Sequence, residues 1–232
     1  MRPFDPLFIL EALAKLFPFL GVTLSILFGT VFIGTLLGAA LAIAKIKKKK
    51  GLKQLAEVYT LVLRCTPPIV LLFLVYYGLP ELIENTFGTN INHINKGIFV
   101  IIALSLLFAA TMSEVIRTSY EAIEKGQYEA AASVGMSEFQ IFRRIMLPQC
   151  VVIMLPNFGN ALIALMKEGA LAYSIGFIDL MGKGQLLIGT NYGAYALETY
   201  LALAVIYWGL TLIIEKILTL CETRLFQWKR SI

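Results

Sequence analysis

Long apolar runs alternate with short polar segments along this chain of 232 residues. Several runs reach the roughly 20 residues that a helix needs to cross about 30 Å of hydrocarbon. They do not show the two-residue alternation of a membrane β-barrel strand. The pattern predicts five membrane-spanning helices, at Phe19–Ala44, Leu55–Leu79, Gly97–Ile116, Val151–Leu171 and Thr199–Leu220. We therefore expect an all-α integral membrane protein in which residues 1–232 form a single transmembrane domain.

Composition agrees with a bilayer environment. Apolar residues make up 58% of the chain, charged residues only 15%, and the mean hydropathy is +0.77. These values exceed what a water-soluble core of this size requires. Residues 1–17 carry acidic and basic side chains among apolar ones and have no small-residue cleavage site, so they predict an interfacial amphipathic helix and not a signal peptide.

The basic residues set the orientation of the predicted spans. The net charge of +5 does not indicate nucleic acid, because a group of lysines lies between the first two apolar runs, where basic residues fix membrane topology. That group comprises Lys45, Lys47, Lys48, Lys49, Lys50 and Lys53. The positive-inside rule places it in the cytosol, together with residues 117–149 and the tail after Leu220. The N-terminus is then outside and the C-terminus cytosolic.

Prolines interrupt two of the predicted spans. Pro67 and Pro68 break the second, and Pro156 lies within the fourth, so backbone carbonyls are freed there for neighbouring helices or a water-lined cavity. Transport paths often run through such breaks. Because five helices enclose little space, we expect the path to lie between two copies or between two similar subunits.

The cytosolic segment 117–149 carries the most specific pattern in the chain. It contains E-A-A, three residues, G, nine residues and I-x-L-P, which starts at Glu129 and ends at Pro148. At residue frequencies of roughly 5–10%, this order arises by accident less than about once in ten thousand such chains. The run from Glu129 to Phe142 is helix-compatible, and Gly135 permits a sharp backbone turn. A segment this long between spans predicts a docking element for a partner.

The segment resembles the E-A-A loop of permease subunits of ATP-binding-cassette importers, in particular the polar amino acid branch. Similarity covers nearly the whole chain and includes Arg64-Cys65-Thr66-Pro67-Pro68, Ser113-Glu114-Val115-Ile116-Arg117, Leu155-Pro156 with Asn160, and Lys167-Glu168. The resemblance implies a type I importer fold, a separate ATPase that binds ATP and Mg²⁺, an extracytoplasmic amino-acid-binding protein and a second permease in a homo- or heterodimer. This chain itself needs no cofactor, since it has no phosphate-binding G-x-x-x-x-G-K motif. We expect a multi-pass protein of the bacterial plasma membrane that contacts lipid and no nucleic acid.

Two sets of residues follow as candidate sites. By resemblance, the residues that couple to the ATPase are Glu129, Ala130, Ala131, Gly135, Ile145, Leu147 and Pro148. Polar groups in or beside spans are candidates for the substrate path, because such groups are costly in hydrocarbon unless they serve a path or a bundle contact. These are Arg64, Glu114, Asn157, Asn160, Lys167 and Glu168. No catalytic residue and no metal site is predicted, and His93 has no second ligand nearby.

Three alternatives stay open at this stage. The solute could be an opine or a sulfur-containing amino acid, because Cys65 and Gly169 depart from the family pattern near the path candidates. An intramembrane enzyme using Glu114 or Lys167 lacks the accompanying paired carboxylates or serine motif. A scaffold or assembly protein would tolerate substitution of Pro67, Pro156 and the intraspan polar groups.

Overall fold

A computed structural model describes residues 3–47 and 50–230, and these residues form a bundle of helices joined by short turns. The described residues do not include Lys48 and Lys49, which belong to the predicted cytosolic lysine group. They also do not include Met1 and Arg2 of the predicted interfacial helix. In chain order the helices are α1 (Pro6–Leu16), α2 (Leu20–Ile46), α3 (Lys50–Cys65), α4 (Pro68–Phe73), α5 (Leu79–Phe87), α6 (Lys96–Glu121), α7 (Lys125–Ser133), α8 (Glu138–Ile141), α9 (Leu147–Gly169), α10 (Leu180–Thr190) and α11 (Ala196–Arg230). Tighter or wider helical turns join some of them, at η1 (Phe17–Phe19), η2 (Leu74–Gly78), η3 (Phe142–Met146) and η4 (Ala170–Ile175).

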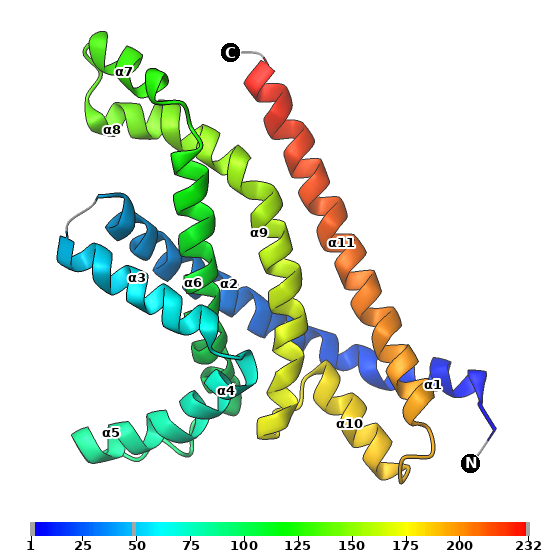
Figure 1. The fold of residues 1–232 in the computed structure, drawn as a ribbon. Coiled ribbons are helices and arrows are strands. Elements are labelled where there is room, and N and C mark those ends of the chain that lie inside the picture. The colour runs from blue at the N-terminus through cyan, green and yellow to red at the C-terminus, as the bar shows by residue number, and fades with distance from the viewer. Residues whose placement is uncertain (1–2, 48–49, 231–232) are drawn as a thin grey trace.

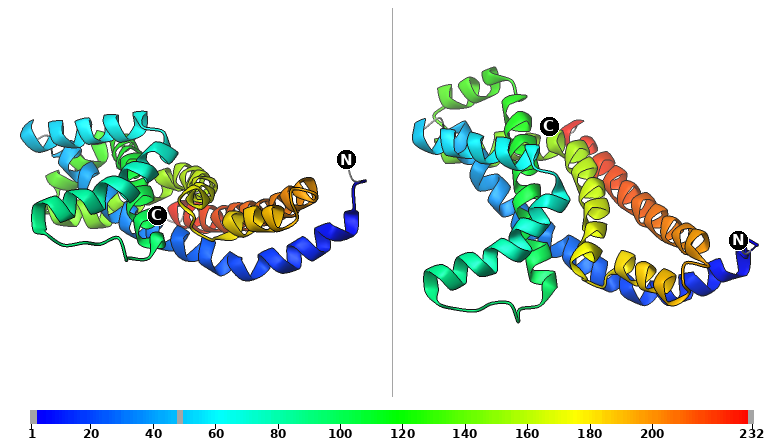
Figure 2. Two further views of the ribbon diagram at one scale, coloured as in Figure 1. Left: turned by 90° about the horizontal axis from the view of Figure 1, so that it is seen from below. Right: turned by 60° about the horizontal axis from the view of Figure 1, so that its bottom comes forward.

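The long helices α6 and α9 run between two ends of the molecule. One end carries α7 and α8, and the other carries α5 and α10 (Figure 1). Helix α2 crosses α6 at a close contact, and α11 ends near the α7 and α8 end (Figure 1, Figure 2). The main core lies where α2, α4, α6 and α9 meet, around Val100, Phe108 and Met112.

Five helical stretches in the described residues are long and apolar enough to span a membrane, which confirms the all-α membrane fold. Their bounds differ from the prediction most clearly in the second span. We expected Leu55–Leu79, whereas the chain leaves the helix after Cys65 and the apolar stretch covers Pro68–Phe87. Pro67 adopts an extended conformation with ψ 137°, because a proline at position 68 disfavours a helical residue before it.

Helix α1 is joined to α2 by only three residues, so the first apolar stretch runs over Pro6–Ile46 and not from Phe19. One side of α1 is buried through Phe8, Ala12 and Leu16, which pack against α10 and α11. The Phe8 ring stacks on Tyr195 with centroids 3.7 Å apart. The interfacial position of residues 1–17 stays a prediction.

Among the described helices, α2 and α6 share the most extensive contact, and small residues let them approach closely. A Cβ added at Gly34 would lie 2.9 Å from the Phe108 ring and 3.1 Å from the Ser105 carbonyl oxygen. One at Gly38 would lie 2.7 Å from Met112 Cβ. Gly34 and Gly38 therefore form a small-xxx-small contact, which lets two backbones approach closely in a membrane.

Substitution of Gly38 is expected to destabilise the protein. Gly38→Ala puts a methyl group against the backbone and Cβ atoms of α6, and overpacking of this kind costs about 1–3 kcal/mol. Gly21→Ala is the matched control, because a Cβ at Gly21 in the same helix meets nothing within 4 Å. Thermal unfolding in detergent should show a lower midpoint for Gly38→Ala alone, and equal midpoints would contradict the close contact.

Candidate functional site

The E-A-A segment forms two helices and not one. We expected a helix-compatible run from Glu129 to Phe142 with a sharp turn permitted at Gly135, and α7 ends at Ser133 while α8 begins at Glu138. Gly135 lies between them with φ +81°, a conformation that a residue with a side chain rarely adopts. Ser137 then starts α8 through a capping box with Gln140. The left-handed turn at Gly135 thus divides the helix-compatible run into two short helices.

A small core of its own holds the segment on the bundle. Ala131 and Ile141 are buried, and they pack with Ile123, Met146 and Cys150 at the ends of α6 and α9. A side-chain hydrogen bond from Gln149 to Gln127 also joins α9 to α7. The two short helices are therefore fixed relative to the spans to which they connect.

The outer surface of the segment is apolar where it would meet water. Val134 is 76% exposed and Phe139 is 69% exposed, and Phe142 and Tyr128 are also exposed. Glu129 and Ala130 are exposed beside them. We had not singled out Val134 or Phe139 from the sequence, although apolar residues in a segment expected to be cytosolic were a usable signal. Exposed large side chains of this kind mark an interaction surface.

Ile145, Leu147 and Pro148 have a different place. They lie where η3 passes into α9, and Pro148 occupies the first turn of α9, where a missing backbone N–H breaks no helical hydrogen bond. Ile145 and Pro148 are half-buried. These residues set how α9 leaves the E-A-A segment, whereas Glu129 and Ala130 are exposed on α7.

Three of the predicted path residues share one face of α9. Asn157, Asn160 and Lys167 are exposed and lie at spacings of three and seven residues, which a 3.6-residue period places on one side of a helix. The opposite side carries buried Leu165 and Met166. The described part of the chain offers no hydrogen-bond or ion-pair partner to the three polar side chains. An unpartnered polar face on a spanning helix is costly against lipid.

The other three path candidates are placed differently. Arg64 is exposed near the end of α3, on another helix from the α9 face. Glu168 lies at the edge of the α9 face and is half-buried. Glu114 faces the interior, where its Oε1 accepts a hydrogen bond from Lys45 at 2.6 Å and its Oε2 accepts one from Arg117 at 2.7 Å. Glu114 is thus committed to an ion-pair network.

A small cavity lies between α2, α6 and the end of α9. Its volume is about 10 Å³, room for about one water molecule, and its lining includes Thr23, Thr30 and Asp179. Asp179 caps α10, accepting a hydrogen bond from the Gly182 amide at 2.9 Å. Burial raises the pKa of the Asp179 carboxyl above its ordinary value, and the hydrogen bonds from Gly182 and Thr23 oppose that rise. A cavity of this size has no room for a solute as large as an amino acid.

The five apolar stretches and the polar face of α9 fit the class of membrane-embedded transport subunits. The chain belongs to the family of binding-protein-dependent transport system inner membrane components, which matches residues 12–227.

Individual relatives match this chain over nearly their whole length. The chain is 37% identical to the L-cystine transport system permease protein TcyL of Bacillus subtilis (strain 168), over 97% of this chain and 92% of that protein. It is 35% identical to the arginine transport system permease protein ArtQ of the same organism, over 94% and 92%. A crystal structure of an amino acid ABC transporter with histidines matches with a TM-score of 0.82 and 33% identity, over 96% of this chain and 100% of that chain. These matches confirm the resemblance noted from the E-A-A segment.

Proposed function

We propose that this chain forms, with a second permease, the path by which a polar amino acid is imported across the bacterial plasma membrane. The unpartnered polar face of α9 carries the proposal. Asn157, Asn160 and Lys167 would be stabilised by facing a water-filled path or another subunit, and destabilised by facing lipid. The second permease is an identical or a homologous copy, so that the path is lined from two sides.

An amino acid suits the chemistry of this face. Lys167 and the two asparagine amides donate hydrogen bonds to a carboxylate. Glu168, at the edge of the face, or carbonyls freed near Pro156 accept from an ammonium group. The relatives named above are a cystine and an arginine transport system permease, and both have a similar sequence identity to this chain. Sequence identity alone therefore does not show which amino acid this chain transports. An opine or a sulfur-containing amino acid is the alternative solute.

Energy for import comes from a separate ATPase that docks on α7 and α8. The exposed side chains of Glu129, Val134 and Phe139 form the surface that enters its cleft. That partner binds ATP and Mg²⁺, and this chain acts as a permease and not as an enzyme. An extracytoplasmic binding protein delivers the amino acid to the opposite end of the molecule, near α5 and α10.

The proposed topology places α7, α8 and the C-terminus in the cytosol and the N-terminus outside. In a chain without native cysteines, Ser137→Cys should react with an impermeant maleimide only from the cytosolic side, and Asn90→Cys only from outside. Both positions are exposed and lie at opposite ends of α6. Labelling of inside-out and right-side-out vesicles tests this, and the reversed pattern would overturn the orientation.

The function is tested by reconstitution with the partner ATPase and the binding protein in proteoliposomes. A thermal-shift panel of polar amino acids, cystine and opines on the binding protein first identifies the solute. We expect hydrolysis and uptake to rise only when the binding protein carries that solute. Chemical turnover by the isolated chain would favour an intramembrane enzyme. Unchanged uptake after substitution of Pro67, Pro156 and the α9 polar face would favour a scaffold.

A further inference from the structure

A buried lysine joins three helices on the side where α6 leads to the E-A-A segment. Lys45, at the end of α2, is only 4% exposed. Its ammonium donates to Thr60 Oγ1 of α3 at 2.6 Å, to Ser113 Oγ of α6 at 2.9 Å and to Glu114 Oε1 of α6 at 2.6 Å. Lys45 belongs to the lysine group that was expected to lie in the cytosol, and its side chain is enclosed between helices.

The enclosure matches the hydrogen-bonding capacity of an ammonium group. A lysine has three N–H donors and no acceptor, and each donor here has one acceptor. Thr60 and Ser113 give their own hydroxyl hydrogens to the carbonyl oxygens of Ala56 and Ala110, at 2.8 and 2.9 Å, so both hydroxyls are free to accept. The contact is therefore a built site and not a lysine side chain trapped by chance.

Beyond Lys45, side chains of alternating charge continue along α6 toward the E-A-A segment. Glu114 also accepts from Arg117, whose Nη1 donates to Glu121 Oε2 at 2.5 Å. Glu121 is the last residue of α6, and α7 begins at Lys125. The network thus runs from a buried site shared by α2, α3 and α6 to the base of α7.

We propose that Lys45 is a positioning residue for coupling, which locks α2 and α3 onto α6 so that a displacement of α7 and α8 moves all three helices together. The proposal rests on the proposed function, in which α7 and α8 receive the movement of the ATPase. Helix α3 carries the path candidate Arg64 near its end. Without the Lys45 contact, movement of α6 would be transmitted to α3 less completely.

Two variants separate this role from plain stability. Thr60→Val keeps the shape of the side chain and the Lys45–Glu114 ion pair but removes the α3 acceptor. Lys45→Met combined with Glu114→Gln removes both charges together, so that neither is left buried alone. In both variants we expect basal ATP hydrolysis to persist. The stimulation by loaded binding protein should fall by at least about fivefold, the lower end of coupling between distant sites.

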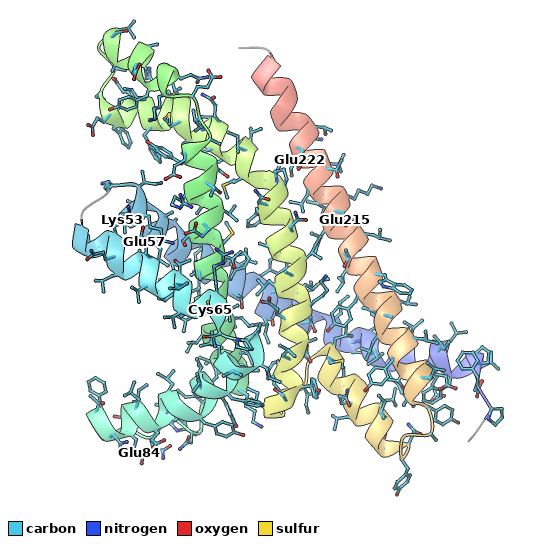
Figure 3. All side chains as sticks on the ribbon, viewed as in Figure 1. Lys53, Glu57, Cys65, Glu84, Glu215 and Glu222 are labelled. Carbon is cyan, nitrogen blue, oxygen red and sulfur yellow. The ribbon has the colours of Figure 1, made fainter. Side chains whose placement is uncertain are left out.

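Two controls remove contacts of similar kind. Tyr59→Phe deletes another α3-to-α6 hydrogen bond, from the Tyr59 hydroxyl to the Leu106 carbonyl oxygen at 2.8 Å. Lys53→Met deletes a lysine on the surface of α3 whose ion pair with Glu57 is exposed (Figure 3). Both controls should keep the stimulation within about twofold, because exposed pairs and single neutral hydrogen bonds contribute little.

The outcomes distinguish the alternatives. Lower melting temperatures with unchanged stimulation in both test variants would overturn the proposal and leave Lys45 a structural residue. Equal loss of stimulation in Tyr59→Phe would also overturn the proposal, because loss of any contact between α3 and α6 would then be enough to reduce stimulation. If the double variant fails to insert, Thr60→Val decides the matter. A wild-type complex that shows no stimulation at all would instead contradict the proposed function.

Discussion

Glu129→Lys and Gly135→Trp are each expected to reduce uptake by about 100-fold while the protein still inserts into the membrane. Glu129 is exposed on α7, in the surface that we assign to the ATPase. Reversing its charge sets a cation against partner groups that we expect to donate hydrogen bonds, so the cation is left unpaired. Disruption of a buried interfacial charge pair costs about 2–5 kcal/mol. Glu129→Gln should have a smaller effect, because the amide still accepts hydrogen bonds.

The effect at Gly135 has two physical causes. Its φ of +81° strains any residue with a side chain, at about 1–3 kcal/mol. An added Cβ meets nothing within 4 Å inside the chain, so a bulky side chain there extends outward and obstructs the partner. We therefore expect a bulky side chain at this position to leave the folding of the spans intact and to interfere with binding of the ATPase.

Co-purification of the ATPase and hydrolysis with loaded binding protein are the measurements. Gly51→Trp and Glu222→Lys serve as controls, because a Cβ at Gly51 also meets nothing within 4 Å and Glu222 lies on α11, a separate helix from α7 and α8 (Figure 3). Both controls should retain the ATPase. If Glu129→Lys and Gly135→Trp retain it too, and hydrolysis still responds to binding protein, α7 and α8 are not the coupling element.

Lys167→Ala and Asn160→Ala are expected to lower uptake by about 10-fold or more without reducing insertion. Each removes a donor that the described chain leaves unpartnered on the α9 face. A lost hydrogen bond to a charged group costs about 1.5–3 kcal/mol, and each 1.4 kcal/mol is a factor of ten. Insertion should even improve, since a polar group is removed from a spanning helix.

Transport kinetics in proteoliposomes, normalised to membrane-inserted protein, test the path. Lys216→Ala is the matched control, because Lys216 is also exposed on a spanning helix but lies on α11. ATPase retention should be normal in all three variants, which separates a path defect from a coupling defect. Unchanged uptake in Lys167→Ala and Asn160→Ala would make both residues contacts of the helix bundle.

The sequence by itself determined the all-α membrane fold, the number of apolar stretches, the family and the position of the E-A-A segment. These are local properties: hydrophobic length is summed along one helix, and a motif is a spacing along one chain. The break at Pro67 and Pro68 was also predictable, because proline acts on its own backbone and on the residue before it.

The tertiary structure decided which side of each helix faces inward and which charges meet. Glu114 and Lys167 are both charged residues in spans, yet Glu114 is bound by Lys45, 69 residues away in the chain, whereas Lys167 is exposed. Lys45 belongs to a lysine-rich segment, and nothing in the sequence of that segment singles it out as the lysine that is enclosed. Burial and hydrogen bonding depend on residues far apart in sequence, so hydropathy and spacing could identify the polar residues of the spans but not their partners.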